Sequence, residues 1–249
     1  MIFLSNTSVY NNSVQRGNIP VDTPCQHGAV PQRMSGTYYT TKTMNEHYFS
    51  SSPSGQDRRR VVDVELAEQD VQVETSGSIF SPDGVDRGTR VLLEVVADPP
   101  AAGEFLDIGS GWGPIALTMG LLSPGADITA VEVNERAAML TQTNAARLGI
   151  DNIRVQHPDD VSTGATFDLI WSNPPIRIGK TALHDILTRW LPTLKPGGQA
   201  WLVVAKKLGA DSLLPWIQSM LDAKAPGEFS VRRAATDKGF RVLLVERVL

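Results

Sequence analysis

From about residue 104 onward, short apolar runs alternate along the chain with longer segments in which apolar residues recur at helical spacing. The short runs are typical of strands buried on both faces, and the longer segments predict amphipathic helices. The predicted strands span residues 105–108, 128–131, 153–155, 167–171 and 200–205, and the predicted helices span 115–122, 134–148, 183–191 and 213–221. Strands that alternate with helices predict an α/β fold with a parallel sheet.

Smaller elements are predicted on either side of this region. Residues 62–66 and 71–73 alternate apolar and polar positions around a polar turn, which predicts a β-hairpin. Asp86 precedes apolar residues at helical spacing, so we expect a helix capped by Asp86 after the hairpin. Residues 229–234 and 241–248 are predicted to form a closing antiparallel pair of strands.

The first part of the chain lacks these patterns. Residues 1–45 are rich in Asn, Ser, Thr, Gly and Pro and show no hydrophobic periodicity, which is typical of a disordered or loosely attached leader. Met44 is therefore a candidate translation start. We assign residues 46–98 to an extension that contains the hairpin and its helix, and residues 99–249 to the main domain.

Composition narrows the class of protein. With 249 residues and 41% hydrophobic content, the chain is long enough to bury one substantial core. Its net charge of -4 argues against non-specific coating of nucleic acid. The single cysteine, Cys25, excludes an internal disulfide and a cysteine zinc site. No apolar run approaches the about 20 residues of a membrane span, so we expect a cytoplasmic protein without membrane contact.

A glycine-rich turn follows the first strand of the main domain. Asp107 lies at the carboxyl end of that strand, and Gly109, Gly111 and Gly113 remove side chains that would keep a ligand away from the backbone. Pro114 suits the first position of the following helix. A strand, a glycine turn and a helix in this order predict a ligand-binding turn of the Rossmann type.

The spacing of this turn favours S-adenosylmethionine over NAD. A dinucleotide fingerprint starting at Gly109 needs glycine where the chain has Pro114. The Asp107 carboxylate would repel a pyrophosphate, but it suits a cationic ligand such as an ammonium beside a sulfonium. A tight turn without a ligand would use the same glycines. Glu132, which ends the next strand, favours a ligand because its carboxylate would accept hydrogen bonds from both ribose hydroxyls.

Other polar residues follow the third and fourth strands. Asp159 and Asp160 come after the third strand, and Asn173, Pro174 and Pro175 come after the fourth. The two prolines stop both strand and helix, so we expect the segment 173–175, called the tip below, to be rigid. Because ligands bind beyond the carboxyl ends of parallel strands, we expect these residues to lie beside the glycine turn.

Taken together, the segments 107–113, Glu132 and 172–175 resemble class I methyltransferases of the small "MTS" type, which use S-adenosylmethionine. Within this family the chain looks most like the small-subunit ribosomal RNA guanine-N(2)-methyltransferases, in the form with Asn-Pro-Pro-Ile-Arg. The likeness extends over nearly everything after the first 45 residues. It implies a Rossmann-like, seven-stranded, mostly parallel sheet with helices on both faces and the last strand antiparallel. It also implies methyl transfer to an exocyclic amino group, with S-adenosylhomocysteine as product.

The resemblance assigns roles to residues in the cofactor site. Asp107, Gly109 and Gly111 would hold the methionine end of the cofactor. Glu132 would hold the ribose, and Asp159 or its neighbour Asp160 would hold the adenine amino group. No metal is expected, since the sulfonium already provides the leaving group and positioning provides most of the rate.

The resemblance also implies an acceptor site at Asn173, Pro174 and Pro175, with Asn173 next to the cofactor. The lone pair of an exocyclic amino nitrogen is delocalised into the ring, so transfer is helped when the Asn173 side-chain carbonyl and the Pro174 backbone carbonyl bind its two protons. Where many relatives have Tyr or Phe to stack on the base, this chain has Ile176.

Three aromatic residues, Phe49, Phe80 and Trp112, are therefore candidates for the other face of the base. The acceptor itself stays open between guanine, an adenine amino group and a protein glutamine amide. A non-catalytic protein that binds S-adenosylmethionine or RNA is the alternative from another class. The intact tip argues against it.

Basic residues near the tip are predicted to contact the substrate. Ile176, Arg177 and Lys180 follow the acceptor residues, and we expect the two cations to bind ribosomal RNA or the small subunit rather than DNA. Further basic residues would extend this surface only if the fold brings them together: 58–60, 206–207, 232–233 and Lys238. The histidines are expected to be structural or solvent-facing, because none has a partner at metal-ligand spacing. The oligomeric state stays open.

Overall fold

The computed structural model describes residues 58–77, 79–175 and 179–248, all of which belong to the unit formed by residues 43–249. The predictions for the leader at residues 1–45, for Cys25 and Phe49, and for Ile176 and Arg177 therefore lie outside the described residues.

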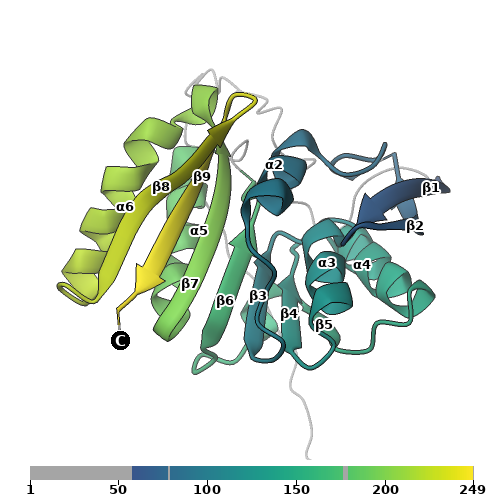
Figure 1. Cartoon of the computed structure of the whole chain (residues 1–249), viewed down its shortest axis with the longest axis horizontal. Helices are drawn as coiled ribbons and strands as arrows, with labels where there is room; N and C mark the ends of the chain where they lie inside the picture. Colours follow the sequence, from purple (N-terminus) through teal and green to yellow (C-terminus); the bar gives the residue numbers. More distant parts are fainter. Residues whose placement is uncertain (1–57, 78, 176–178, 249) are drawn as a thin grey trace, which may run out of the picture. The chain divides into compact units, whose positions relative to one another are not determined.

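A seven-stranded sheet forms the centre of the described region, with the strand order β5-β4-β3-β6-β7-β9-β8 (Figure 1). The strands are β3 (Glu104–Ile108), β4 (Asp127–Val131), β5 (Ile153–Gln156), β6 (Phe167–Ser172), β7 (Leu194–Ala205), β8 (Phe229–Asp237) and β9 (Phe240–Arg247). Strands β3 to β7 pair in parallel, and β9 runs antiparallel to both β7 and β8. The predicted fold class, including the reversed last strand, is confirmed.

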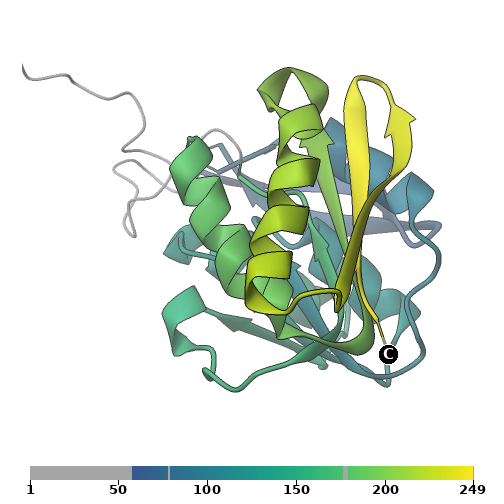
Figure 2. The same cartoon turned by 90° about the vertical axis from the view of Figure 1, so that its left-hand side faces the viewer.

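Helices cover both faces of the sheet, as expected. They are α2 (Arg87–Val95), α3 (Pro114–Leu122), α4 (Glu135–Arg147), α5 (Lys180–Trp190) and α6 (Ala210–Lys224). Side chains of α5 and α6 pack with Leu106 and Ile108 on one face of β3. Side chains of α2 and α3 pack with Phe105 on the other face, as the two-residue period of a strand requires. Figure 2 shows α5 and α6 on the side of β7 to β9 opposite α2.

Strand β7 begins earlier than the apolar run predicts. The run suggested a start at Ala200, but the strand begins at Leu194, which pairs with Phe167 of β6 before a register shift. Gly198 permits this close pairing, since a Cβ there would lie 3.0 Å from the Asp168 carbonyl oxygen and 3.1 Å from that of Phe167. The first part of this strand contains polar and glycine residues, so the hydrophobic pattern does not indicate where it begins.

The predicted hairpin and its helix are present. Strands β1 (Arg59–Leu66) and β2 (Gln69–Ser76) pair antiparallel around a turn of Ala67 and Glu68, both with positive φ. Asp86 caps α2 as expected. No helix in the described ranges is long and apolar enough to cross a membrane.

One buried side chain ties the hairpin to α4. Asn144 accepts a hydrogen bond from the Glu74 N–H at 2.6 Å and donates to the Glu74 carbonyl at 3.0 Å, as a neighbouring strand would. Asn144 also donates to the Trp112 carbonyl in the glycine turn at 2.9 Å. The hairpin is thus held against the same helix that holds the turn.

Candidate functional site

A cavity of about 330 Å³ lies at the carboxyl ends of the central strands. Strand β3 has β4 on one side and β6 on the other, which is the point where ligands bind in doubly wound sheets. Seven of the residues singled out from the sequence line the cavity: Phe80, Gly109, Gly111, Glu132, Asp159, Asn173 and Pro175. Strand ends that are far apart in the sequence therefore meet at one site.

The glycine turn needs its glycines for backbone reasons. Gly109 and Gly111 have φ values of 76° and 60°, a conformation that side chains disfavour. A Cβ on Gly111 would meet no atom within 4 Å, so space is open beside it. The Thr141 hydroxyl of α4 donates to the Gly111 carbonyl at 2.9 Å and fixes the turn.

Glu132 is held by backbone groups on both sides. Its Oε2 accepts from the Gly111 N–H at 2.9 Å, and its Oε1 accepts from the Asn134 N–H at 2.9 Å. Burial raises the pKa of Glu132, and these backbone hydrogen bonds oppose the rise. A carboxylate oxygen has more than one acceptor position, so Glu132 can also accept from hydroxyls of a ligand in the cavity.

Asp107 lies behind the turn and is fully buried. Its Oδ2 accepts from the Ala116 N–H at 3.0 Å, while no described residue donates to its Oδ1. Burial raises the pKa of Asp107 to about 8, and the nearby Glu132 adds to this rise. Asp107 does not itself line the cavity. A positively charged ligand beside the turn would favour the ionised form of both carboxyl groups, whereas a pyrophosphate would oppose it, so this part of the site suits a cation better.

Asp159 and Arg189 form another part of the cavity wall. Oδ1 of Asp159 accepts from Arg189 Nη1 at 2.8 Å, and this hydrogen bond lowers the pKa of Asp159. Arg189 also donates to the Pro158 carbonyl. Asp160 is exposed and does not line the cavity, so of the two predicted acids only Asp159 is in position. Arg189 lies on α5 beside apolar core positions, where nothing in the sequence singled it out.

Asn173 is held by two residues near the start of α2. Its Nδ2 donates to Asp86 Oδ2 at 2.9 Å and to Thr89 Oγ1 at 3.1 Å. A carboxylate accepts and does not donate, so the chemistry requires the nitrogen of the amide, rather than its oxygen, to face Asp86. Within the described ranges no group is seen donating to Oδ1 of Asn173. The sequence pattern predicts Asp86 as a helix cap and does not indicate its contact with Asn173.

The two prolines complete the tip. Pro174 is buried, and Pro175 lines the cavity, with its Cδ 3.5 Å from the position that a Cβ on Gly109 would take. The Ser172 hydroxyl donates to the Ile108 carbonyl at 2.7 Å and ties the tip to β3. Lys180 is exposed at the first position of α5 and does not line the cavity.

The two aromatic candidates within the described residues, Phe80 and Trp112, differ in their exposure to the cavity. Phe80 lines the cavity together with its neighbour Ile79. Trp112 is only 1% exposed and packs in a cluster with Leu66 and Val73 of the hairpin. The expectation that Trp112 could stack on a substrate is therefore wrong, because the hairpin covers a side chain that a glycine turn would otherwise expose.

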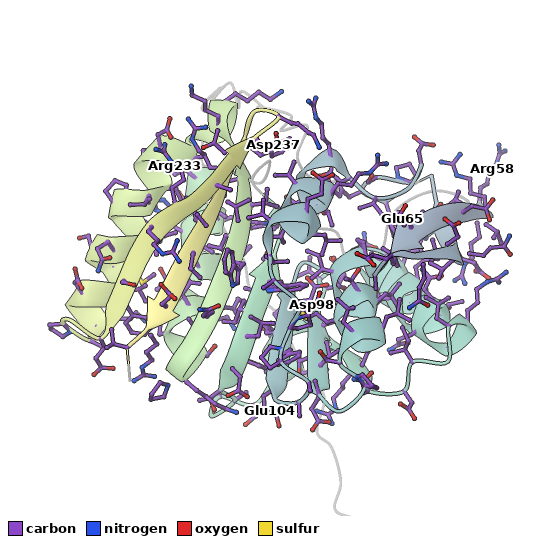
Figure 3. The ribbon with its side chains drawn as sticks, viewed as in Figure 1. Arg58, Glu65, Asp98, Glu104, Arg233 and Asp237 are labelled. Atoms are coloured by element: carbon purple, nitrogen blue, oxygen red, sulfur yellow. The ribbon has the colours of Figure 1, made fainter. Side chains whose placement is uncertain are left out.

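The basic residues of the hairpin and those of β8 lie apart. Figure 3 shows Arg58 at the hairpin and Arg233 on β8, at opposite ends of the described region. Arg60 forms an ion pair with Asp83, and Lys238 pairs with Glu94 at 2.9 Å. A single basic surface that includes both the hairpin and β8 is thus excluded.

Histidines contribute packing and capping. His184 stacks on Trp216, and the ring nitrogen of His157 accepts from the Asp159 N–H at 3.3 Å beside the cavity. In the part of the chain that the structure describes, no group of three or more His, Cys, Asp or Glu residues is placed to hold a metal ion.

Comparison with known proteins adds to this geometry. The family described as "Methyltransferase small domain" matches residues 70–243. The chain is 33% identical over 208 residues to a Bacillus subtilis protein called uncharacterized protein YbxB, with 82% of this chain and 100% of that protein covered. It is 34% identical over 159 residues to ribosomal RNA small subunit methyltransferase C of Serratia proteamaculans, which covers 62% of this chain and 43% of that enzyme. The chain thus spans less than half of the length of this second relative.

A solved structure shares the fold. The T. thermophilus 16S rRNA N2 methyltransferase RsmC, in complex with AdoMet and guanosine, matches with a TM-score of 0.60 and 20% identity over 79% of this chain and 52% of that one. At this identity the match establishes the architecture alone.

Proposed function

Since the chain belongs to the methyltransferase small domain family, we propose that it transfers a methyl group from S-adenosylmethionine to an exocyclic amino group of ribosomal RNA. The guanine 2-amino group of small-subunit RNA is the proposed target. The names of the Serratia relative and of the T. thermophilus structure support this target.

The proposed cofactor fits the residues that form the cavity. Glu132 would accept from the ribose hydroxyls, and Asp159 from the adenine amino group. The methionine end would lie along Gly109 and Gly111, and its positive charge would favour the ionised form of Asp107 behind the turn, whose Oδ1 has no partner among the described residues. When bound, S-adenosylmethionine would supply a methyl group on a sulfonium. The acceptor nitrogen's lone pair would form the N–C bond while the C–S pair stayed on sulfur, and the nitrogen would release a proton to water.

The orientation of Asn173 is the observation that carries the proposal. Both N–H groups of its amide are engaged by Asp86 and Thr89, which leaves the carbonyl oxygen as the atom available to a substrate. This oxygen would accept a hydrogen bond from the target amino group, and the Pro174 backbone carbonyl would accept the second. The nitrogen lone pair is then turned out of conjugation and toward the methyl donor, in a preorganised site.

Phe80 is proposed to replace the stacking residue that is absent at position 176. It lies in the wall of the cavity and also beside Asn173 in a smaller adjoining pocket. An aromatic face there would hold a base that has left its stack. We further propose that Lys180 and Arg177, which flank the tip in the sequence, bind the RNA backbone, in the cytoplasm where ribosomes assemble.

The test is transfer of labelled methyl groups. Purified protein and methyl-labelled S-adenosylmethionine would be incubated in parallel with small subunits, large subunits, naked ribosomal RNA and cell extract, followed by nuclease digestion and chromatography of the nucleosides. We expect label in N(2)-methylguanosine from the small subunit or its RNA. Label in methyladenosine or in protein glutamine would overturn the guanine assignment, and cofactor binding without transfer to any of them would favour a binding protein.

A further inference from the structure

We infer that Asp86 and Thr89 are positioning residues, which fix the polarity of the Asn173 amide so that only an acceptor atom faces the substrate. The inference rests on the proposed function, in which the Asn173 oxygen binds the target amino group. Asp86 and Thr89 line the smaller pocket beside Asn173, but their role here needs no contact with the reacting atoms. They act through Asn173.

The polarity of an amide is not fixed by its shape. Rotating the Asn173 amide by half a turn exchanges its oxygen and nitrogen with almost no change in volume. In the rotated form, the N–H groups would meet the N–H groups of the target amino group, and neither hydrogen bond could form. A site for an amino group therefore needs neighbours that accept hydrogen bonds from one side of this amide.

Asp86 and Thr89 meet that need. Oδ2 of Asp86 lies 2.9 Å from Asn173 Nδ2, and Oγ1 of Thr89 lies 3.1 Å from it. The same Asp86 oxygen accepts from the Gly88 N–H at 2.7 Å and the Thr89 N–H at 3.4 Å. The carboxylate is thus held by the first turn of α2, and Thr89 is 3% exposed. Both acceptors are fixed before any ligand binds.

The start of α2 also approaches the tip too closely for a side chain. A Cβ on Gly88 would lie 3.0 Å from Asp86 Oδ2 and 3.3 Å from Asn173 Nδ2, with Phe240 at 3.0 Å on another side. Gly88 does not have a left-handed φ, so space rather than backbone conformation requires glycine there. This independent observation indicates that the contact between α2 and the tip is closely packed.

The arrangement has a consequence for substrate chemistry. With both amide N–H groups engaged, Asn173 can accept a hydrogen bond from a substrate and cannot donate one. A target atom that carries hydrogen can therefore form a hydrogen bond with Asn173, whereas an unprotonated ring nitrogen cannot. The segment that contains Asp86 would therefore help to select amino groups, although it lies 87 residues before Asn173.

The test removes the two acceptors while keeping the helix cap. Thr89→Val has nearly the same shape but lacks the acceptor, and Asp86→Ser keeps a residue that caps helices well while shortening its reach. We expect Thr89→Val to lower the single-turnover methylation rate about tenfold and the double variant to lower it about a hundredfold. S-adenosylmethionine affinity should stay within about threefold. Thr89→Ser, which restores an acceptor, should recover most of the rate lost in Thr89→Val.

Two further measurements separate positioning from a structural role. In an Asn173→Ala background, the Asp86 and Thr89 changes should have no further effect on the rate, whereas a merely structural role predicts the same loss in both backgrounds. The side-chain amide protons of Asn173 should exchange slowly in NMR spectra of the wild type and quickly in the double variant. Equal losses in both backgrounds, or protons that exchange quickly in the wild type, would overturn the inference. Slow exchange in a protein that methylates no RNA would instead contradict the proposed function alone.

Discussion

The backbone N–H of Gly111 donates to Oε2 of Glu132 over 2.9 Å, which joins the glycine turn after β3 to the carboxylate after β4. Two predicted parts of one site, 21 residues apart, are thereby held in a fixed relation. Removing the carboxylate should disturb both the proposed ribose contact and the turn.

We therefore expect Glu132→Ala to weaken S-adenosylmethionine binding by roughly 1.5–3 kcal/mol, the usual range for hydrogen bonds to a charged group. Calorimetric titration measures this directly, and NAD should bind to neither protein. Asp160→Ala is the matched control, because Asp160 is exposed and lies outside the cavity wall. Equal affinity of Glu132→Ala and wild type would remove Glu132 from the cofactor site.

Asn173→Ala should leave cofactor affinity within about threefold but lower the single-turnover methylation rate about a hundredfold, comparable to the loss of one preorganised polar group elsewhere. Asn173→Asp is the isosteric comparison. It should lose nearly as much activity, since a second carboxylate would meet Asp86 and would also favour the charged ground state. A wild-type rate in either variant would show that the acceptor is held by other groups.

The buried Asp107 predicts a pH dependence of stability. Its pKa is about 8 in the folded chain against 3.8 for the free group, so it is protonated when folded and ionised when unfolded between these values. Unfolding then releases a proton, and the free energy of unfolding should fall as pH rises, by up to about 1.4 kcal/mol per pH unit. Urea unfolding at pH 5, 6 and 7 measures the slope.

Asp107→Asn should flatten that slope, because the amide does not titrate. The raised pKa of Glu132 acts in the same direction and remains in this variant. The difference between the two proteins is therefore the quantity that tests Asp107. Identical slopes would show that its pKa is not raised.

Gly88→Ala tests the close approach of α2 to the tip. The added Cβ would push on both Asp86 and Asn173, and we expect the methylation rate to fall about tenfold or more, as small displacements of catalytic groups do. Gly164→Ala is the control, since a Cβ there meets nothing within 4 Å and the backbone is not left-handed. Similar rates for the two variants would argue against a packed contact.

Asn144→Ala should destabilise the fold, because the change leaves partly buried groups of Glu74 and the buried carbonyl of Trp112 without their hydrogen-bond partner. Each such group costs roughly 1–3 kcal/mol when unpaired. Gln142→Ala, on the exposed face of the same helix, should change the free energy of unfolding by less than about 0.5 kcal/mol. Denaturant unfolding compares the two variants.

Much of the architecture could be predicted because it follows from local patterns. Apolar runs, helical spacing and the capping residue Asp86 place nearly all of the described elements, and the Asp86 cap is observed. The start of β7 was missed because Leu194 belongs to the strand only through its pairing with Phe167. That pairing is a property of the assembled sheet.

The candidate site residues that follow strand ends could be predicted from the sequence. Contacts between elements that are distant in the sequence were harder to predict. Gly109, Gly111 and Glu132 follow strands whose ends must lie together. The contact of Asp86 with Asn173 depends on how α2 packs, and Arg189 reaches Asp159 from a helix face that reads as ordinary surface. The burial of Trp112 required knowing where the hairpin docks. No short-range pattern encodes these three relationships.

Asn144 is hydrogen-bonded to both Glu74 in the hairpin and Trp112 in the glycine turn, so the stability of the hairpin should report on the state of the turn. A ligand that binds the turn disfavours local unfolding in which the turn loses its hydrogen bond to Asn144. The hairpin loses its own hydrogen bonds to Asn144 in the same unfolding events. Deuterium uptake along β2 should therefore slow when the cofactor binds, although no β2 residue lines the cavity. Occupancy of the site could then be followed from the outer edge of the protein, without any enzymatic assay.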